Sequence, residues 1–144
     1  MAQISGYNLP DDLHYAEDHA WVRVEADGRV RVGWDDFAQK LAGELSFVKV
    51  PKAGKPIQKG KVLFSVQSGK WAGKILSPID GLIAEVNDDL TFEPTKVNQD
   101  CYGAGWVAVL EPSRLAEDLK ALIPPGEKVA EWIRKEIELH ASGK

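Results

Sequence analysis

The sequence predicts a mainly β fold with helices at its C-terminal end, on the strength of two features of its apolar pattern. Through residue 112, apolar and polar side chains alternate in short runs, which is the period of a half-buried strand. Beyond residue 112, apolar residues recur three and four positions apart, which is the period of an amphipathic helix. We therefore expect the 144 residues to form a single domain over 1–144, with a β core over about 13–112 and a helical extension over about 113–144.

The first two strands are expected to form a hairpin. In residues 21–25 and 29–32 Val alternates with polar side chains after Trp21, and the two segments flank the dipeptide Asp27-Gly28. This dipeptide is typical of tight turns between antiparallel strands, because its residues tolerate a positive φ.

A short internal helix is expected next. The Asp35 carboxylate is suited to cap its N-terminus, and Gly43 is suited to end it. Phe37 and Leu41 are four residues apart and share one face of this helix, so we expect both to be buried.

The remaining strands are separated by segments rich in Pro and Gly, which favour turns. We expect these strands at 45–50, 62–66, 75–76, 82–86 and 106–110. In all, about seven short strands would close into a flattened barrel or sandwich.

Two helices are expected in the C-terminal extension. Ser113 is the expected N-cap of a helix through Leu122, which the prolines at 124–125 would terminate. A second helix over about 127–140 carries Val129, Ile133 and Ile137 along one stripe, which we expect to pack on the β core.

Composition and charge exclude several classes of partner. The formal net charge is −4, and Lys and Arg alternate with Asp and Glu, so we expect no nucleic-acid partner. No apolar run approaches the roughly 20 residues that span a bilayer, and residues 1–10 lack the pattern of a signal peptide. The single Cys101 cannot form an internal disulfide, which suits a reducing compartment. We expect a cytoplasmic monomer with no membrane partner.

The chain is poor in motifs for catalysis. No pattern brings any of the three histidines, His14, His19 and His140, to a nucleophile, and no phosphate-binding loop or zinc-ligand spacing is present. A lone thiol at Cys101 would be reactive if exposed, but the neighbouring Asp100 would raise its pKa, so we interpret Cys101 as a buried structural residue. We expect no enzymatic activity and no metal site.

One lysine is placed where it can be modified. The segment 66–74 reads VQSGKWAGK between two runs of strand-forming residues, with Lys70 at the expected tip of a hairpin. An ordinary solvated turn lysine is the alternative interpretation. The arrangement resembles the modified-lysine hairpin of lipoyl and biotinyl domains, and the flanks Gly69 and Trp71, where biotin carriers have Met, favour lipoate.

The resemblance extends to a particular family over roughly 15–112. The blocks 15–22, 33–39 and 86–106 resemble, in the same order, the H protein of the glycine cleavage system. That resemblance implies a barrel-sandwich hybrid of the lipoyl/biotinyl-carrier type, a carrier without catalytic activity, and lipoate in amide linkage to Lys70. It also implies a groove for the lipoyl arm, for which the candidate residues are His19, Trp34, Asp35 and Trp71.

The chain departs from the family pattern around Lys70. Where the family commonly reads Glu-Ser-Val-Lys-Ala-Ala-Ser-Asp, this chain has Gln67, Gly69, Trp71, Gly73 and Lys74, so two acids are lost and one base is gained. Trp34 also replaces the usual Ile, and Cys101 replaces the usual Pro before Tyr102.

These departures favour a change of partner enzymes. We therefore favour an H-like lipoate-binding protein that serves a heterodisulfide-reductase-like complex in a sulfur oxidation route. The alternative is a true H protein, with glycine decarboxylase, aminomethyltransferase and dihydrolipoyl dehydrogenase as partners. In either case a lipoate ligase or lipoyl transferase would load the lysine. A third hypothesis belongs to a different functional class: the chain would be an unlipoylated structural or interaction module.

Overall fold

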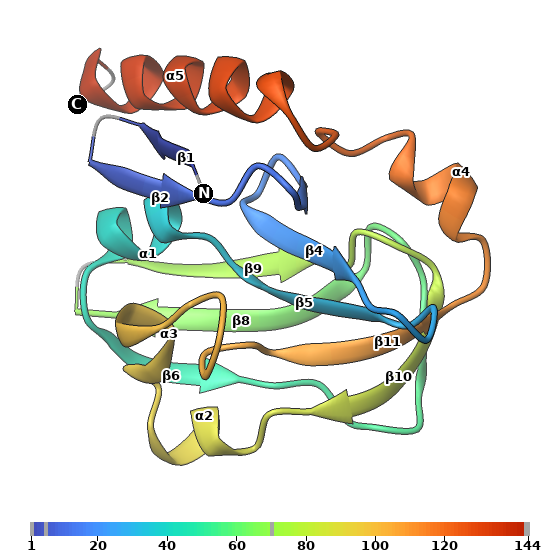
Figure 1. Ribbon diagram of the computed structural model, residues 1–144. Coiled ribbons are helices and arrows are strands. Elements are labelled where there is room, and N and C mark those ends of the chain that lie inside the picture. The colour runs from blue at the N-terminus through green and yellow to red at the C-terminus, as the bar shows by residue number, and fades with distance from the viewer. Residues whose placement is uncertain (1, 5, 70, 143–144) are drawn as a thin grey trace.

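The computed structural model describes residues 2–4, 6–69 and 71–142, and it confirms the predicted mainly β fold. Within these residues the strands form three antiparallel sheets, and the two larger ones face each other (Figure 1). Lys70, on which the lipoate expectation depends, lies outside the described residues.

The larger sheet has six strands and contains the expected N-terminal hairpin. In spatial order its strands are β3 (His14–Tyr15), β4 (Ala20–Val24), β5 (Val30–Trp34), β11 (Ala108–Pro112), β10 (Gly81–Val86) and β7 (Pro56–Ile57). β4 and β5 pair in the register Val22↔Val32, and Gly28 in the turn between them has a φ of 89°. The Asp-Gly turn was therefore predicted correctly.

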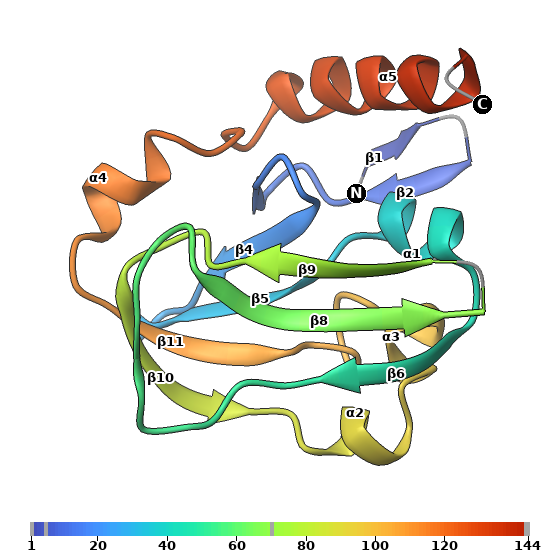
Figure 2. The same cartoon turned by 180° about the vertical axis from the view of Figure 1, so that it is seen from behind.

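The smaller sheet has three strands in the order β6-β8-β9 and lies against the larger one (Figure 2). Its strands are β6 (Leu45–Lys49), β8 (Val62–Ser68) and β9 (Ala72–Leu76). Val32 and Leu110 from the six-stranded sheet meet Phe64 and Ile75 from the three-stranded sheet in one apolar cluster, and all four are buried. The space between the sheets is therefore the main core.

Helix α1 (Asp36–Ala42) begins and ends as the sequence predicts. The Ala38 N–H donates to the Asp35 carboxylate over 2.8 Å, and the Gly43 N–H donates to the Gln39 carbonyl over 3.0 Å. Phe37 is buried, but the expectation for Leu41 is wrong because its side chain is 40% exposed. Leu41 lies in the last turn of the helix, where it lines a cavity instead of the core.

Six short elements were not anticipated. Two are the edge strands β3 and β7 of the six-stranded sheet, and the others are β1 (Ala2–Ile4), β2 (Tyr7–Leu9), α2 (Asp89–Phe92) and α3 (Lys96–Gln99). β1 and β2 pair with each other and lie between α1 and the C-terminal helix (Figure 1).

The C-terminal extension is helical, but its first helix is shorter than expected. Helix α4 spans Leu115–Leu119, and Arg114, not Ser113, occupies its N-cap position without a side-chain capping bond. The Ser113 N–H instead donates to the Asp80 carbonyl over 3.0 Å, which extends the pairing of β11 by one residue. The N-cap prediction for Ser113 is therefore wrong.

Helix α5 (Glu127–Ser142) buries the predicted stripe. Val129 and Ile133 are fully buried, and Ile137 is partly buried. They contact a second apolar cluster, which includes Trp21 of β4 and Phe37 of α1, so the helix covers the β core together with the N-terminal hairpin. None of the described helices is long and apolar enough to cross a membrane.

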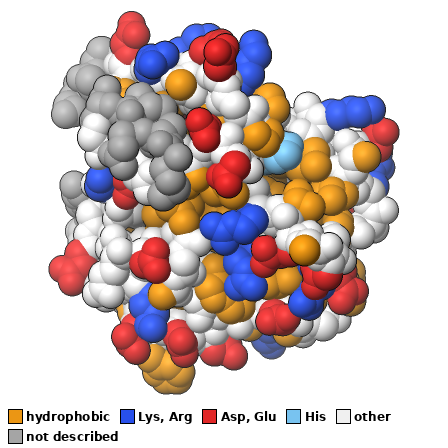
Figure 3. Space-filling model, in the orientation of Figure 1, with side chains coloured by type: hydrophobic (Ala, Val, Ile, Leu, Met, Phe, Trp, Pro, Cys, Tyr) orange, Lys and Arg blue, Asp and Glu red, His pale blue; other side chains and the backbone are white. Residues whose placement is uncertain are grey.

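Charges of both signs are interspersed on the surface. On the face shown in Figure 3, Lys and Arg side chains lie among Asp and Glu side chains, and hydrophobic side chains form patches between them. This mixture fits the small formal net charge of −4.

Candidate functional site

The site begins at the end of the β8–β9 hairpin. The two strands pair antiparallel from Val62↔Leu76 to Gln67↔Ala72. Beyond the last pair, the Ser68 N–H donates to the Trp71 carbonyl over 2.7 Å, and the Trp71 N–H donates to Ser68 Oγ over 3.1 Å. These bonds fix the two residues that flank the connection 69–70. A Cβ added to Gly69 would meet nothing within 4 Å beyond its chain neighbours, so there is open space beside Gly69.

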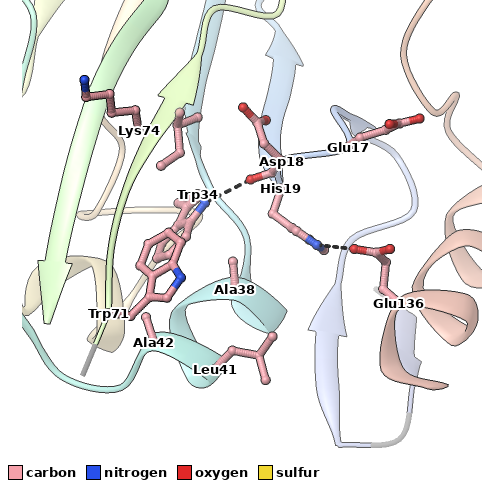
Figure 4. A pocket seen from close by; sticks show the side chains of 11 residues that line it. Glu17, Asp18, His19, Trp34, Ala38, Leu41, Ala42, Trp71, Lys74 and Glu136 are labelled. Carbon is pink, nitrogen blue, oxygen red and sulfur yellow. Dashed lines mark hydrogen bonds and ion pairs between the residues drawn. The ribbon is translucent and has the colours of Figure 1, made fainter. Parts of the chain in front are cut away.

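A cavity of about 520 Å³ adjoins this end of the hairpin (Figure 4). It lies between β9, helix α1, the loop before β4 and helix α5. Its apolar wall consists of Trp34, Ala38, Leu41, Ala42, Trp71 and Ile75. Its polar wall consists of Glu17, Asp18, His19, Lys74 and Glu136. In Figure 4 the amino end of Lys74 points away from the two indoles.

Two tryptophans stack against each other in the wall of this cavity. The ring centroids of Trp34 and Trp71 are 5.4 Å apart, and the ring planes differ by 22°. Trp34 is only 3% exposed, and its indole N–H donates to the Asp18 carbonyl over 3.2 Å. Trp71 is 43% exposed, and its ring folds back over Gly73, where any Cβ would collide with it. The stack therefore has one fixed ring and one half-exposed ring.

His19 connects the cavity wall to helix α5. Its Nδ1 lies 2.7 Å from Asp35 Oδ2, and its Nε2 lies 2.8 Å from Glu136 Oε1. The imidazole also packs between the rings of Phe37 and Trp132, with centroid distances of 5.1 and 4.8 Å. A protonated His19 donates a hydrogen bond to each carboxylate at once.

The two carboxylates favour the protonated imidazole. Burial by itself lowers the pKa of His19, but the charge of Asp35 and the hydrogen bonds to Asp35 and Glu136 outweigh it, so the pKa lies above its ordinary value of 6.5. Burial raises the pKa of the Asp35 carboxyl, and the charge of His19 opposes this rise. The pair therefore holds its protons more tightly than the free side chains would.

Asp18 joins three parts of the wall. Its Oδ2 accepts a hydrogen bond from the Leu76 N–H over 2.8 Å, which ties the loop before β4 to β9. Its carbonyl accepts the hydrogen bond from Trp34. Its Oδ1 is buried and has no hydrogen-bond partner among the described residues.

The structure brings most of the expected groove residues together. His19, Trp34 and Trp71 line one cavity, whereas Asp35 is fully buried behind His19 and does not line it.

Sequence reasoning missed four polar residues of this wall, Glu17, Asp18, Lys74 and Glu136. Glu17 and Asp18 precede His19 in one of the blocks that resemble the H protein, and Lys74 is one of the departures from its motif, so these three could have been suspected. Glu136 is 117 residues from its partner His19, and no local pattern could have paired them.

Cys101 is buried, as the structural interpretation expects. Its side chain is 5% exposed, and burial raises the pKa of the thiol, with further contributions from Asp36, Asp35 and Asp100. Among the described residues there is no cluster of three or more His, Cys, Asp or Glu side chains that could hold a metal ion.

Comparisons with known proteins agree on one family. A family model described as "Glycine cleavage H-protein" matches residues 13–136. A "Probable glycine cleavage system H protein" of Pyrococcus horikoshii is 41% identical over 134 residues, which cover 93% of this chain and 98% of the relative. "Glycine cleavage system H protein 2" of Aquifex aeolicus is 39% identical over 139 residues, which cover 96% of this chain and 86% of the relative.

A solved structure has the same fold. The crystal structure of a glycine cleavage system H protein from Mycobacterium marinum superposes with a TM-score of 0.73 at 30% identity, covering 89% of this chain and 98% of that chain. This likeness confirms the barrel-sandwich type of fold. The family match and the long alignments with these relatives show that the chain belongs to the glycine cleavage H-protein family.

Proposed function

We propose that this chain, as one carrier domain, is the H protein of a glycine cleavage system, with lipoate in amide linkage to Lys70. The observation that carries the proposal is family membership combined with the position of Lys70 in the chain. It belongs to the connection of the β8–β9 hairpin, whose flanking residues Ser68 and Trp71 are fixed by two hydrogen bonds. The open space beside Gly69 gives a lipoate ligase or lipoyl transferase room to approach.

The cavity next to the hairpin fits a lipoyl group. Its volume of about 520 Å³ lies in the range typical of small-molecule sites, about 300–1,000 Å³. The wall formed by Trp34, Ala38 and Ile75 suits a hydrocarbon chain, and sulfur makes favourable contacts with aromatic rings. Lipoate would supply a pair of sulfur atoms that accept and release the transferred group.

In this proposal the side chains of the cavity hold the lipoyl group and shield it from water, but they do not take part in the reaction. Both nitrogens of His19 are engaged by carboxylates, so this imidazole is not poised as a base for a nucleophile. An apolar cavity keeps water away from a labile group on sulfur. The chemistry therefore belongs to the cofactor and to the partners, which we propose are glycine decarboxylase, aminomethyltransferase and dihydrolipoyl dehydrogenase. A tethered group reaches each of them at a high effective concentration.

The names of the relatives favour glycine cleavage over the sulfur oxidation route that the sequence analysis preferred. None of these names supports a heterodisulfide-reductase-like partner. The residues that motivated that preference, Trp71 and Lys74, do line the cavity, so they are a reason to test the partner directly.

The first test is the intact mass of the protein purified from its native host. We expect an increase of one lipoyl group in the wild type and in Lys74→Arg, a matched change in the same hairpin, but not in Lys70→Arg. An unmodified wild-type protein, in cells whose other lipoyl proteins are modified, would contradict the carrier function and favour the unlipoylated module.

The second test identifies the partners. We expect the lipoylated protein to support glycine–bicarbonate exchange by glycine decarboxylase, and Lys70→Arg to abolish that exchange. Lipoylated protein that is inactive in this assay but is reduced or loaded by a heterodisulfide-reductase-like complex would replace glycine cleavage with the sulfur route.

A further inference from the structure

We propose that Trp71 is a gate that controls access from the cavity beside the hairpin to the indole face of Trp34. Stacked on Trp34, the Trp71 ring covers this face while the rest of the cavity stays open, and the face becomes available only when the ring turns away. The inference rests on the proposed function, because the occupant would be the sulfur-bearing chain attached to the preceding residue, Lys70. Trp71 is a positioning residue in this proposal and takes no part in the chemistry.

Three departures from the family motif form one structural unit. Trp34, Trp71 and Gly73 replace Ile, Ala and Ser, and nothing in the sequence connects them. In the structure the two indoles stack, and Gly73 is required because a Cβ at that position would collide with the Trp71 ring. The stack needs both indoles, and the position of the Trp71 ring needs a glycine at residue 73. The three departures are therefore structurally coupled in this chain.

The two rings differ in how firmly they are held. Trp34 is 3% exposed and is anchored by its hydrogen bond to the Asp18 carbonyl. The Trp71 ring is 43% exposed, and its indole nitrogen makes no hydrogen bond to the described residues. The backbone of Trp71 is fixed by Ser68, so the motion that opens the gate is a rotation of the Trp71 side chain.

The position of Trp71 makes it a competitor for the cavity. It directly follows the residue expected to carry lipoate, and its ring lies on Trp34 in the cavity wall. An occupant tethered at residue 70 that packs on this face of Trp34 therefore has to replace the indole of Trp71 there. An aromatic pair of this kind shifts such an equilibrium about twofold to tenfold.

The geometry of the gate is tested on the unlipoylated protein. Trp34 and Trp71 are the one Trp–Trp pair with a ring contact among the described residues, so their exciton-coupled circular dichroism reports the stack. We expect Trp71→Ala and Gly73→Ala each to remove this signal. Phe47→Ala is the matched control, because Phe47 is an equally exposed aromatic residue (46%) of the same sheet and does not line the cavity. An unchanged signal in Trp71→Ala would overturn the gate.

The effect of the gate is tested on the lipoylated protein with a phosphine that reduces the lipoyl disulfide. We expect Trp71→Ala to be reduced about twofold to tenfold more slowly than wild type, because the opened cavity shelters the disulfide. Phe47→Ala should react like wild type. A lipoylated Trp71→Ala protein that is reduced at the wild-type rate or faster contradicts the gate alone. The intact mass of each protein shows separately whether it carries a lipoyl group. If neither the wild type nor any variant carries one, the proposed function fails, and the gate fails with it.

Discussion

His19 combines an unusual backbone conformation with contacts to two carboxylates and two aromatic rings. It is the only non-glycine residue with a positive φ among the described residues, at 75°, a conformation that costs about 1 kcal/mol or more. The cost is offset by two carboxylates, Asp35 and Glu136, and by two aromatic rings. The sequence places this histidine at the cavity, but its function there is to join elements that are far apart in the chain.

The raised pKa of His19 predicts how stability depends on pH. The folded protein binds the proton more tightly than the unfolded chain, so this stabilisation is fully present below the unfolded pKa of about 6.5 and is lost as the pH rises through the folded pKa. The raised pKa of Asp35 acts in the same direction. We expect the free energy of unfolding, measured with urea, to fall as the pH is raised above about 6.5.

Two variants isolate this contribution. His19→Gln should be less stable by about 3 kcal/mol at pH 6, because it leaves Asp35 buried without its charged partner, and its stability should depend less on pH. His14→Gln should keep the downward slope, because burial lowers the pKa of His14. A His19→Gln protein with the wild-type slope would show that another group is responsible.

At the scale of elements, helix α5 is held by different interactions along its length. Val129 and Ile133 bury its first half against the second apolar cluster. Glu136 then bonds to His19 beside the cavity, and Leu139 further along is 62% exposed. The second half of the helix therefore depends more on the Glu136 contact than the first half does.

This difference predicts a local effect of Glu136→Ala. We expect a loss of about 1–3 kcal/mol in the free energy of unfolding, because a buried imidazole loses its partner. Hydrogen exchange should also become faster in the amides that follow Ile133, but not in those near Val129. Glu131→Ala is the control, since its side chain is 55% exposed and should change stability by less than about 0.5 kcal/mol. Equal exchange along the whole helix would contradict the uneven anchoring.

The elements that the sequence predicted well have local signals. The β4–β5 hairpin follows from the Asp-Gly turn, and helix α1 follows from the Asp35 cap and Gly43. Ser113 was misjudged because its backbone continues the pairing of β10 with β11: its N–H bonds to the Asp80 carbonyl, so the helix begins one residue later. α2 and α3 have four residues each, too few for a helical period to show.

The site was only partly predictable, because only some of its residues have a local sequence signal. Its aromatic residues and His19 could be suspected from blocks of sequence, but the wall depends on contacts between distant segments. The Leu76 N–H bonds to Asp18 across 58 residues, and His19 bonds to Glu136 across 117. Such contacts are set by how sheets and helices pack, which the local pattern does not encode.

At the scale of the whole molecule, two apolar clusters share a boundary. One lies between the sheets and the other under helix α5, and Tyr102 packs against both. The Trp21 indole N–H donates to the Cys101 carbonyl over 3.0 Å, which adds a polar link at this boundary. The two clusters should therefore unfold together.

A substitution in either cluster tests this coupling. Ile133→Ala under α5 and Phe64→Ala between the sheets should each cost about 2–5 kcal/mol and leave one cooperative transition. Tryptophan fluorescence and far-ultraviolet circular dichroism should give coincident unfolding curves in both variants. Phe92→Ala, whose side chain is 82% exposed, should change stability little. Two separate transitions in Ile133→Ala would show that α5 and its cluster unfold independently.

The burial of Cys101 has a consequence for a protein that would carry a reactive disulfide. Exchange with a disulfide requires a thiolate, and this thiol, the single one in the chain, is 5% exposed with a raised pKa. In a lipoylated molecule, Cys101 would therefore not form a mixed disulfide with a lipoyl sulfur of the same molecule or of a second copy. Such a cross-link would inactivate the carrier. For the same reason, thiol-alkylating reagents applied to the folded, reduced protein would label the cofactor and leave the polypeptide untouched.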